Sequence, residues 1–229
     1  MCGRYVLKAT LQHLSETYGA VPEGTYSSAE PSYNVAPSAH MPVILEDGGQ
    51  RLIRPHRWGL IPFWADSVKT GYSLINARAE TLTKKRSFQK PFSSQRCIVP
   101  ASGFYEWKTT GTGKVPHYIT RKQSDLMHFA GLYEQWNDNS REETVHSYTI
   151  ITTKANTPLS ELHDRMPAML LPTEFSAWLD PANSDAGMLS DLLRPWPDDD
   201  IEFYRVNDEV GNVRNNRPGL LEPYRDLFS

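Results

Sequence analysis

The chain has 229 residues and a formal charge of −3, and 39% of its residues are apolar, 11% aromatic and 22% charged. This balance is typical of one soluble domain with a buried core, and it excludes a disordered chain and a surface that is basic throughout. No segment approaches ~18 consecutive apolar residues, and the sequence does not open on a basic region followed by an apolar run, so we expect a cytoplasmic protein with no membrane partner.

The first predicted element is a helix over residues 10–18, because apolar residues recur there at helical spacing and a glycine follows. After a connection rich in proline and serine, short runs of β-branched and aromatic residues predict strands. These runs are PVILE, RLIRPHRWGL, RCIVPA, GFYEWK, PHYITR, LMHFAGLYEQW, VHSYTIITT and PAMLL. Helical pieces are predicted at PLSELH, TEFSAWL and SDAGMLSDLL.

Long strands followed by peripheral helices indicate an α+β fold. We expect a single domain over residues 1–229, with largely antiparallel sheets curled into an open, barrel-like core. The stretch WNDNSREET lies between two strand runs and predicts a hairpin, not a domain boundary. The acidic stretch PWPDDD predicts a solvated loop.

Two cysteines are too few for a disulfide framework. Cys97 lies in the apolar run RCIVPA and is expected in the core. Cys2 follows the initiator methionine, so removal of Met1 would leave an amine and a thiol on one residue. This 1,2-aminothiol reacts with aldehydes: the amine condenses to an imine, and the thiolate closes onto the imine carbon to give a thiazolidine. A structural cysteine in an N-terminal strand is the alternative.

The stretch INARAET contains a second candidate. The amide of Asn76 has both a donor and an acceptor, so it can fix a sugar or an amine in place. Arg78 shares its face if the segment is extended, and would add a phosphate contact. A turn or helix start with ordinary surface charges explains the same residues.

The stretch SGFYEWK contains a third candidate. If it is a strand, Glu106 points to one face with Phe104, while Tyr105 and Trp107 point to the other. A carboxylate bracketed by aromatic residues is partly desolvated and suits proton transfer near neutrality. An edge-strand glutamate facing water is the alternative.

The stretch HDRMPAML contains a fourth candidate, His163, at a turn that leads into a predicted strand. A structural histidine is the alternative. The other six histidines show no HExxH spacing and no Cys-x-x-Cys partners. The sequence therefore predicts no metal site, and we expect no cofactor.

Together these stretches resemble the SRAP family, named for SOS-response-associated peptidase. The resemblance runs from the second residue to within about a dozen residues of the end. It consists of seven motifs in a fixed order: MCGR, YNVAP, WGLIP, INAR-x-ET, SGFYEWK, HDRMP and VGNVRNN.

Membership would imply a function that composition alone could not indicate. Members bind single-stranded DNA and, through the N-terminal cysteine, form a stable thiazolidine with the ring-opened aldehyde of an abasic site, which shields the strand. By motif, Cys2 would supply both nucleophiles and Glu106 would shuttle protons. His163 would protonate the sugar ring oxygen, and Asn76 would orient the sugar.

The resemblance also implies a DNA-binding set and a partner. Arg4, Arg78 and Arg86 would contact phosphates, Trp107 would support an aromatic wall, and Thr152 would be a further DNA contact. The partner would be single-stranded DNA containing abasic sites, bound by a monomer that associates with the nucleoid. Because the net charge is negative, the arginines would have to converge on one groove.

Two other functions remain open at this stage. One is a cysteine-dependent peptidase or autopeptidase, in which His163 activates the Cys2 thiolate and no free amine is needed. The other is a single-strand-binding module that forms no covalent bond.

Overall fold

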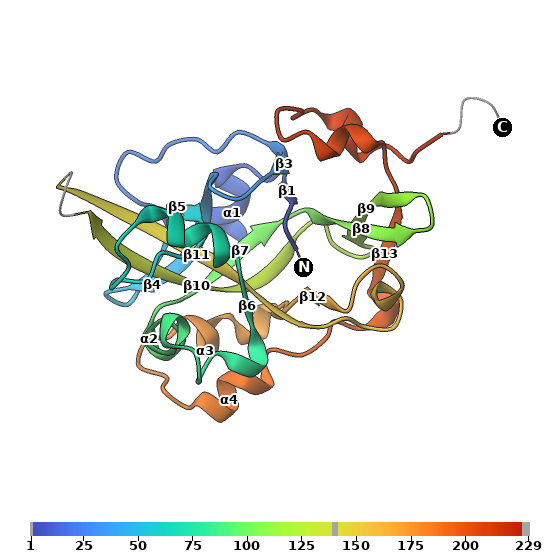
Figure 1. Ribbon diagram of the computed structural model, residues 1–229. Helices are drawn as coiled ribbons and strands as arrows, with labels where there is room; N and C mark the ends of the chain where they lie inside the picture. Colours follow the sequence, from blue (N-terminus) through green and yellow to red (C-terminus); the bar gives the residue numbers. More distant parts are fainter. Residues whose placement is uncertain (1, 139–141, 226–229) are drawn as a thin grey trace.

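The computed structural model describes residues 2–138 and 142–225 (Figure 1). The strands are β1 (Tyr5–Leu7), β2 (Val21–Pro22), β3 (Ser32–Val35), β4 (His40–Asp47), β5 (Gln50–Trp58), β6 (Asn76–Arg78), β7 (Arg96–Ala101), β8 (Gly103–Thr110), β9 (Gly113–Arg121), β10 (Met127–Asp138), β11 (Glu143–Lys154), β12 (Arg165–Pro167) and β13 (Ile201–Arg205). The α-helices are α1 (Leu11–Tyr18), α2 (Arg86–Ser94), α3 (Phe175–Leu179) and α4 (Ala186–Asp191). The 3-10 helices are η1 (Val68–Ser73), η2 (Ala79–Thr81), η3 (Leu159–Glu161), η4 (Pro172–Glu174), η5 (Asp198–Asp200), η6 (Asp208–Gly211) and η7 (Pro218–Leu221).

Five strands close into a barrel. In ring order they are β4, β5, β11, β10 and β7, and every neighbouring pair is antiparallel except β5 with β11. That parallel pair closes the ring by placing Trp58 beside Tyr148. The α+β class and the largely antiparallel, barrel-like core predicted from the sequence are confirmed, and the parallel pair closes the barrel that was expected to be open.

A second sheet, with the order β13-β9-β8-β1-β3, is antiparallel throughout and lies beside the barrel (Figure 1). The chain passes from the barrel to this sheet between β7 and β8, at Ser102 and Gly103. A Cβ atom on Gly103 would lie 2.4 Å from the hydroxyl oxygen of Tyr118, so only glycine fits where β8 meets β9. This passage carries the SGFYEWK motif out of the barrel.

The helices lie outside the barrel, and α2, α3 and α4 gather on one side of it (Figure 1). The predicted helix over residues 10–18 is confirmed as α1. Thr10 caps its N-terminus by accepting a hydrogen bond from the backbone N–H of His13, and Gly19 ends it in the left-handed conformation at φ 59°. Leu11, Leu14 and Tyr18 recur on its buried face, which explains the helical spacing.

The predicted hairpin at WNDNSREET is confirmed, since β10 and β11 pair antiparallel up to Asp138 and Glu143. Residues 139–141 lie outside the part that the structure describes.

Cys97 is buried in the core as predicted, and both Cys2 and Cys97 are free thiols. None of the helices in the described ranges is long and apolar enough to cross a membrane.

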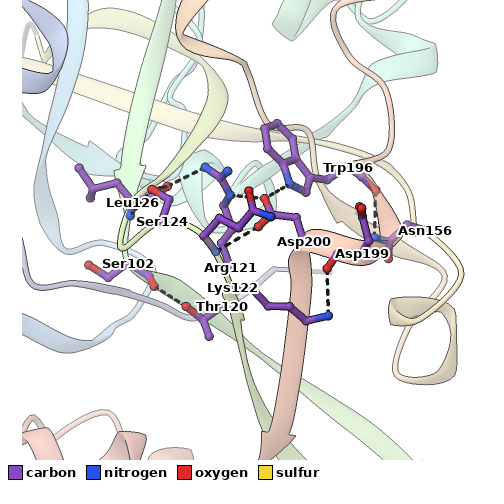
Figure 2. A network of polar contacts seen from close by, with 11 residues as sticks. Ser102, Thr120, Arg121, Lys122, Ser124, Leu126, Asn156, Trp196, Asp199 and Asp200 are labelled. Atoms are coloured by element: carbon purple, nitrogen blue, oxygen red, sulfur yellow. Dashed lines mark hydrogen bonds and ion pairs between the residues drawn. The ribbon is translucent and has the colours of Figure 1, made fainter.

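The prediction of a solvated loop at PWPDDD is wrong for Trp196 and Asp200, which are both buried. The Asp200 carboxylate accepts hydrogen bonds from Nε of Arg121 at 2.7 Å and from Nε1 of Trp196 at 2.8 Å (Figure 2). The Arg121 guanidinium also lies 4.7 Å from the centre of the Trp196 ring. Asp200 is buried because β9 supplies a cation that local sequence could not indicate, whereas Asp198 and Asp199 are exposed as predicted.

The buried histidines predict how stability depends on pH. Burial, reinforced by His146, lowers the pKa of His56 to about 3, and burial lowers that of His128 to about 4. Both folded-state pKa values lie below ~6.5, the pKa of a histidine in the unfolded chain. The two neutral imidazoles therefore contribute fully to stability above that pH, and their contribution is lost as the pH falls toward the folded-state pKa values. We expect the free energy of unfolding to fall by about 2 kcal/mol between pH 7 and 5 from His56 alone.

Urea unfolding at several pH values checks this expectation. In the variant His56→Phe, the free energy of unfolding should change less with pH, because only His128 still contributes. The exposed control His40→Gln should show the same pH dependence as the wild type. An unchanged slope in His56→Phe would show that the pKa of His56 is not lowered in the folded state.

Candidate functional site

Strand β1 carries the N-terminal motif into the space between the barrel and the second sheet. Tyr5 pairs with Phe104 of β8, and the backbone N–H of Tyr105 donates to the carbonyl of Arg4 at 2.9 Å. Because the strands are antiparallel, the residues before Arg4 run alongside the segment that contains Glu106. Cys2 is only 1% exposed, and Met1 lies outside the described residues.

Asn76 fixes Cys2 from the other side. Its Nδ2 donates to the carbonyl oxygen of Cys2 at 2.8 Å. Asn76 begins β6, which pairs in parallel with β11 and is extended, so Arg78 shares its face as predicted. The Oδ1 atom of Asn76 is buried and has no hydrogen-bond partner among the described residues. The Asn76 amide therefore has its nitrogen committed to Cys2, while its oxygen has an unused acceptor among the described residues.

The electrostatics around Cys2 favour the neutral thiol. Burial, and after it the carboxylate of Glu106, raise the pKa of the Cys2 thiol well above its ordinary value. Glu106 is itself only 7% exposed. The thiol is therefore protonated at neutral pH, and any bond that its sulfur forms requires a base to take up the proton. Glu106 is the charged group best placed to do so.

Glu106 and His163 line one pocket of about 540 Å³. Four segments that are far apart in the sequence meet there: β8, β9, the HDRMP turn and the VGNVRNN loop. The lining residues are Glu106, Trp107, Thr109, Lys114, Leu162, His163 and Gly211. The structure thus brings together three of the side chains singled out from sequence, Glu106, Trp107 and His163, and places Cys2 next to Glu106.

The predicted alternation along β8 is present. Phe104 packs in the main core, whereas Tyr105 packs with Val6 and Tyr118 in a separate cluster against which Trp107 lies. The expected turn before the strand at HDRMP is also present, as η3 followed by β12. Both motifs therefore reach the pocket with the local geometry predicted from sequence.

The three arginines differ in their surroundings. Arg78 and Arg86 are exposed, and the Arg86 guanidinium lies 4.8 Å from the centre of the Trp64 ring. Arg4 is partly buried, and its Nη1 donates to Oδ1 of Asn34 at 2.8 Å and to the carbonyl of Val210 at 3.0 Å. Arg4 is therefore an internal anchor as well as a candidate ligand.

Thr152 does not reach the surface. It is fully buried in β11, opposite Arg78 on one side and Pro167 on the other. Its hydroxyl has no hydrogen-bond partner among the described residues. Because this side chain is buried, a DNA strand lying on the surface does not reach it unless the surface opens.

Sequence reasoning missed Asn34, in the YNVAP motif. Its Nδ2 lies within hydrogen-bonding distance of three carbonyls in the VGNVRNN loop, and its Oδ1 accepts from Arg4. The three carbonyls are those of Val210, Asn212 and Asn215, at 3.2, 3.1 and 2.8 Å. The motif itself was the only signal, because these contacts join residues more than 170 positions apart.

A second missed pair joins the INARAET and HDRMP motifs. Arg165 is 9% exposed and binds Glu80 with both terminal nitrogens, at 2.7 and 2.9 Å. The hydrogen bonds from Arg165 lower the pKa of Glu80.

Within residues 2–138 and 142–225, no group of three or more His, Cys, Asp or Glu side chains is arranged to hold a metal ion.

Comparison with known proteins gives a consistent result. The sequence model of the family described as SOS response associated peptidase (SRAP) matches residues 1–213. The chain is 45% identical to the abasic site processing protein YoqW of Bacillus subtilis (strain 168), over 98% of this chain and all of that protein. It is 34% identical to the abasic site processing protein HMCES of Gallus gallus, over 88% of this chain and 68% of that protein.

A solved structure resembles the fold closely. The crystal structure of a protein from Bacteroides thetaiotaomicron superposes with a TM-score of 0.87 at 28% sequence identity, and the match covers 98% of this chain and all of that chain. The barrel and the second sheet therefore form an arrangement found in an experimental structure.

Removing the Asn34 amide should loosen the VGNVRNN loop. We expect Asn34→Ala to lower the free energy of unfolding by about 2–3 kcal/mol, because it removes the hydrogen bonds of Nδ2 to the loop carbonyls and one of the two partners of the Arg4 guanidinium. Urea unfolding and limited proteolysis check this, with new cleavage expected within residues 208–217. The exposed control Asn137→Ala should change stability by less than about 0.5 kcal/mol. Equal stability of the two variants would contradict the anchoring role.

Proposed function

The chain belongs to the SOS response associated peptidase (SRAP) family, and from that premise we propose that it processes abasic sites in DNA by forming a covalent crosslink with them. Cys2, once it is the first residue, forms a thiazolidine with the ring-opened aldehyde of an abasic site in single-stranded DNA, which protects the strand during the DNA damage response. The observation that supports this proposal is the position of Cys2, which is buried next to Glu106, and Glu106 lines the same pocket as His163.

The first chemical step uses the α-amine of Cys2. The amine attacks the aldehyde carbon, water leaves, and an imine forms. The sulfur then adds to the imine carbon, closing a five-membered ring. Because burial keeps the thiol protonated, its proton passes to Glu106 as the S–C bond forms, and the imine nitrogen takes up a proton to become the ring N–H.

Asn76 positions both partners. Its Nδ2 holds the carbonyl of Cys2 at 2.8 Å, and its unpartnered Oδ1 accepts a hydrogen bond from a hydroxyl of the deoxyribose. Fixing the nucleophile and the sugar with one side chain reduces the freedom that must be lost on the way to the transition state. His163 lines the same pocket and protonates the sugar ring oxygen to open the cyclic form.

The DNA strand is held through its backbone. Arg78 and Arg86 contact phosphates, Arg4 supplies positive charge from beneath, and Trp107 forms part of an aromatic wall. Thr152 offers its unpartnered hydroxyl only if the surface above it opens. Binding of this kind has little sequence preference and weakens as salt concentration rises. Residues 1–229 act as one SRAP-like domain, as a monomer in the cytoplasm that meets DNA at the nucleoid.

A second candidate activity is removal of Met1 by the same residues, a cysteine-dependent autopeptidase. The observation that favours it is the placement of Glu106 beside a thiol that needs a base. Here the sulfur would attack the carbonyl carbon of Met1, the bond from that carbon to the nitrogen of Cys2 would break, the nitrogen would leave with a proton, and water would hydrolyse the resulting thioester to release Met1; no free amine would be required. This activity would precede the crosslinking. The crosslinking is lyase-like in that an amine condenses with the sugar aldehyde to an imine.

Crosslinking is tested with protein whose intact mass shows that it begins at Cys2. Incubation with single-stranded DNA containing one abasic site should give a heat-stable, slower band on a denaturing gel. Cys2→Ala should abolish the band, because it removes the sulfur that closes the ring. The matched control Cys97→Ala, in the core, should keep it. A full-strength band from Cys2→Ala would contradict the proposal.

Self-processing is tested by intact-mass analysis of Glu106→Gln. The autopeptidase candidate predicts that this variant retains Met1 while the wild type loses it, because the amide cannot accept the thiol proton. Complete removal of Met1 from Glu106→Gln would assign the step to a separate aminopeptidase.

A further inference from the structure

The imidazole of His163 has two contacts at one nitrogen. Its Nδ1 lies 2.7 Å from Oδ1 of Asp164 and 3.0 Å from the backbone nitrogen of Arg165. Asp164 has a mostly exposed side chain. Because both contacts use Nδ1, Nε2 is the nitrogen left for a ligand in the pocket that His163 lines.

Nδ1 can satisfy these two neighbours only in different protonation states. With a lone pair on Nδ1, the ring accepts from the N–H of Arg165 and is neutral, with its proton on Nε2. With a proton on Nδ1, the ring donates to the carboxylate of Asp164 instead. A proton on both nitrogens gives the imidazolium, which the negative charge of Asp164 stabilises.

We propose that Asp164 is a positioning residue that favours the acid form of His163 and orients its Nε2–H toward the sugar. This inference rests on the proposed function, because it assigns the proton donor for opening the sugar ring. An acid at this position must keep a proton on Nδ1 after Nε2 has given its own away, and Asp164 is the group that accepts from Nδ1–H.

The proton balance of ring opening is then complete. The bond between C1′ and the ring oxygen breaks, and the ring oxygen takes the proton of Nε2. The hydroxyl on C1′ gives its proton to Glu106, and its electron pair forms the C=O bond of the aldehyde. His163 is left neutral, with its remaining proton on Nδ1 facing Asp164.

The backbone around Asp164 is fixed, so the contact does not depend on a loose turn. The carbonyl of Asp164 accepts from the backbone N–H of Ala155 at 3.0 Å. The Arg165 side chain is held by Glu80 and donates to the carbonyl of Thr152 at 2.5 Å. Substituting the Asp164 side chain therefore changes the partner of Nδ1 without removing a structural contact in the described residues.

Other charged groups also face His163. Glu106 from β8 and Lys114 from β9 line the same pocket. Lys108 of β8 lies 3.8 Å from Glu161 of η3, the element that leads into the turn. All four charged groups remain when only Asp164 is changed. Glu161→Gln is the matched control, because it also removes one exposed carboxylate, and that carboxylate pairs with Lys108.

The test measures crosslink formation by protein beginning at Cys2, with excess abasic single-stranded DNA, between pH 5.5 and 8.5. Asp164→Asn should lower the limiting rate about fivefold near pH 7.5, the size expected for an exposed ion pair, while the half-saturating DNA concentration stays within twofold. The loss should shrink as the pH falls, because excess protons restore the imidazolium. Asp164→Glu should recover part of the rate, and Glu161→Gln should match the wild type.

A second readout does not require crosslinking. In ¹⁵N-detected NMR of the free protein, the imidazolium signals of His163, assigned by their loss in His163→Gln, should persist to higher pH in the wild type than in Asp164→Asn. Equal persistence, or an equal rate and pH profile for Asp164→Asn and wild type, overturns the inference. A wild type that forms no crosslink while the NMR difference is present instead removes the proposed function and leaves the contact between Asp164 and His163 standing.

Discussion

The pairing of β1 with β8 is the constraint on which the site depends. Every residue of β1 is buried, and the hydrogen bond from Tyr105 to the carbonyl of Arg4 extends the pairing toward the N-terminus. Chain termini are commonly loose unless they are tied down, and here the second tie is the bond from Asn76 to the carbonyl of Cys2. If Cys2 is the nucleophile, as proposed, this double fixation has already removed much of the conformational freedom that the reaction would otherwise have to remove.

The same burial decides the order of the chemistry. A thiol enclosed beside a carboxylate stays neutral, so in the proposed crosslinking the amine captures the carbonyl first and the sulfur adds as the thiol gives up its proton. In the proposed reaction Glu106, which is buried next to Cys2, accepts protons, and His163, which lines the same pocket, donates them. Arg78 and Arg86 are exposed, outside the buried surroundings of Cys2. In the proposed complex they contact the DNA backbone without disturbing the thiol.

Local features of the structure were predictable from sequence, and long-range ones were not. The capped helix α1, the alternation along β8 and the turn before β12 all follow from short patterns of side chains. The parallel contact of β5 with β11 joins strands about 90 positions apart and has no local signature, so the barrel was expected to be open. The same holds for Asn34 and for Asp200, whose partners lie far along the chain. Motif order singled out candidate site residues, but it could not reveal that Thr152 is buried or that Arg4 is an internal anchor.

The central claim is that one residue presents its nitrogen and its sulfur to the same carbon of the DNA. Mass spectrometry of the crosslinked product, after digestion of both protein and DNA and with or without borohydride, tests it directly. The account predicts a peptide that begins at Cys2, carries the sugar with the loss of one water, and does not change mass with borohydride, because a thiazolidine has no C=N bond. An adduct on a lysine, or one that gains two hydrogens from borohydride, would contradict it.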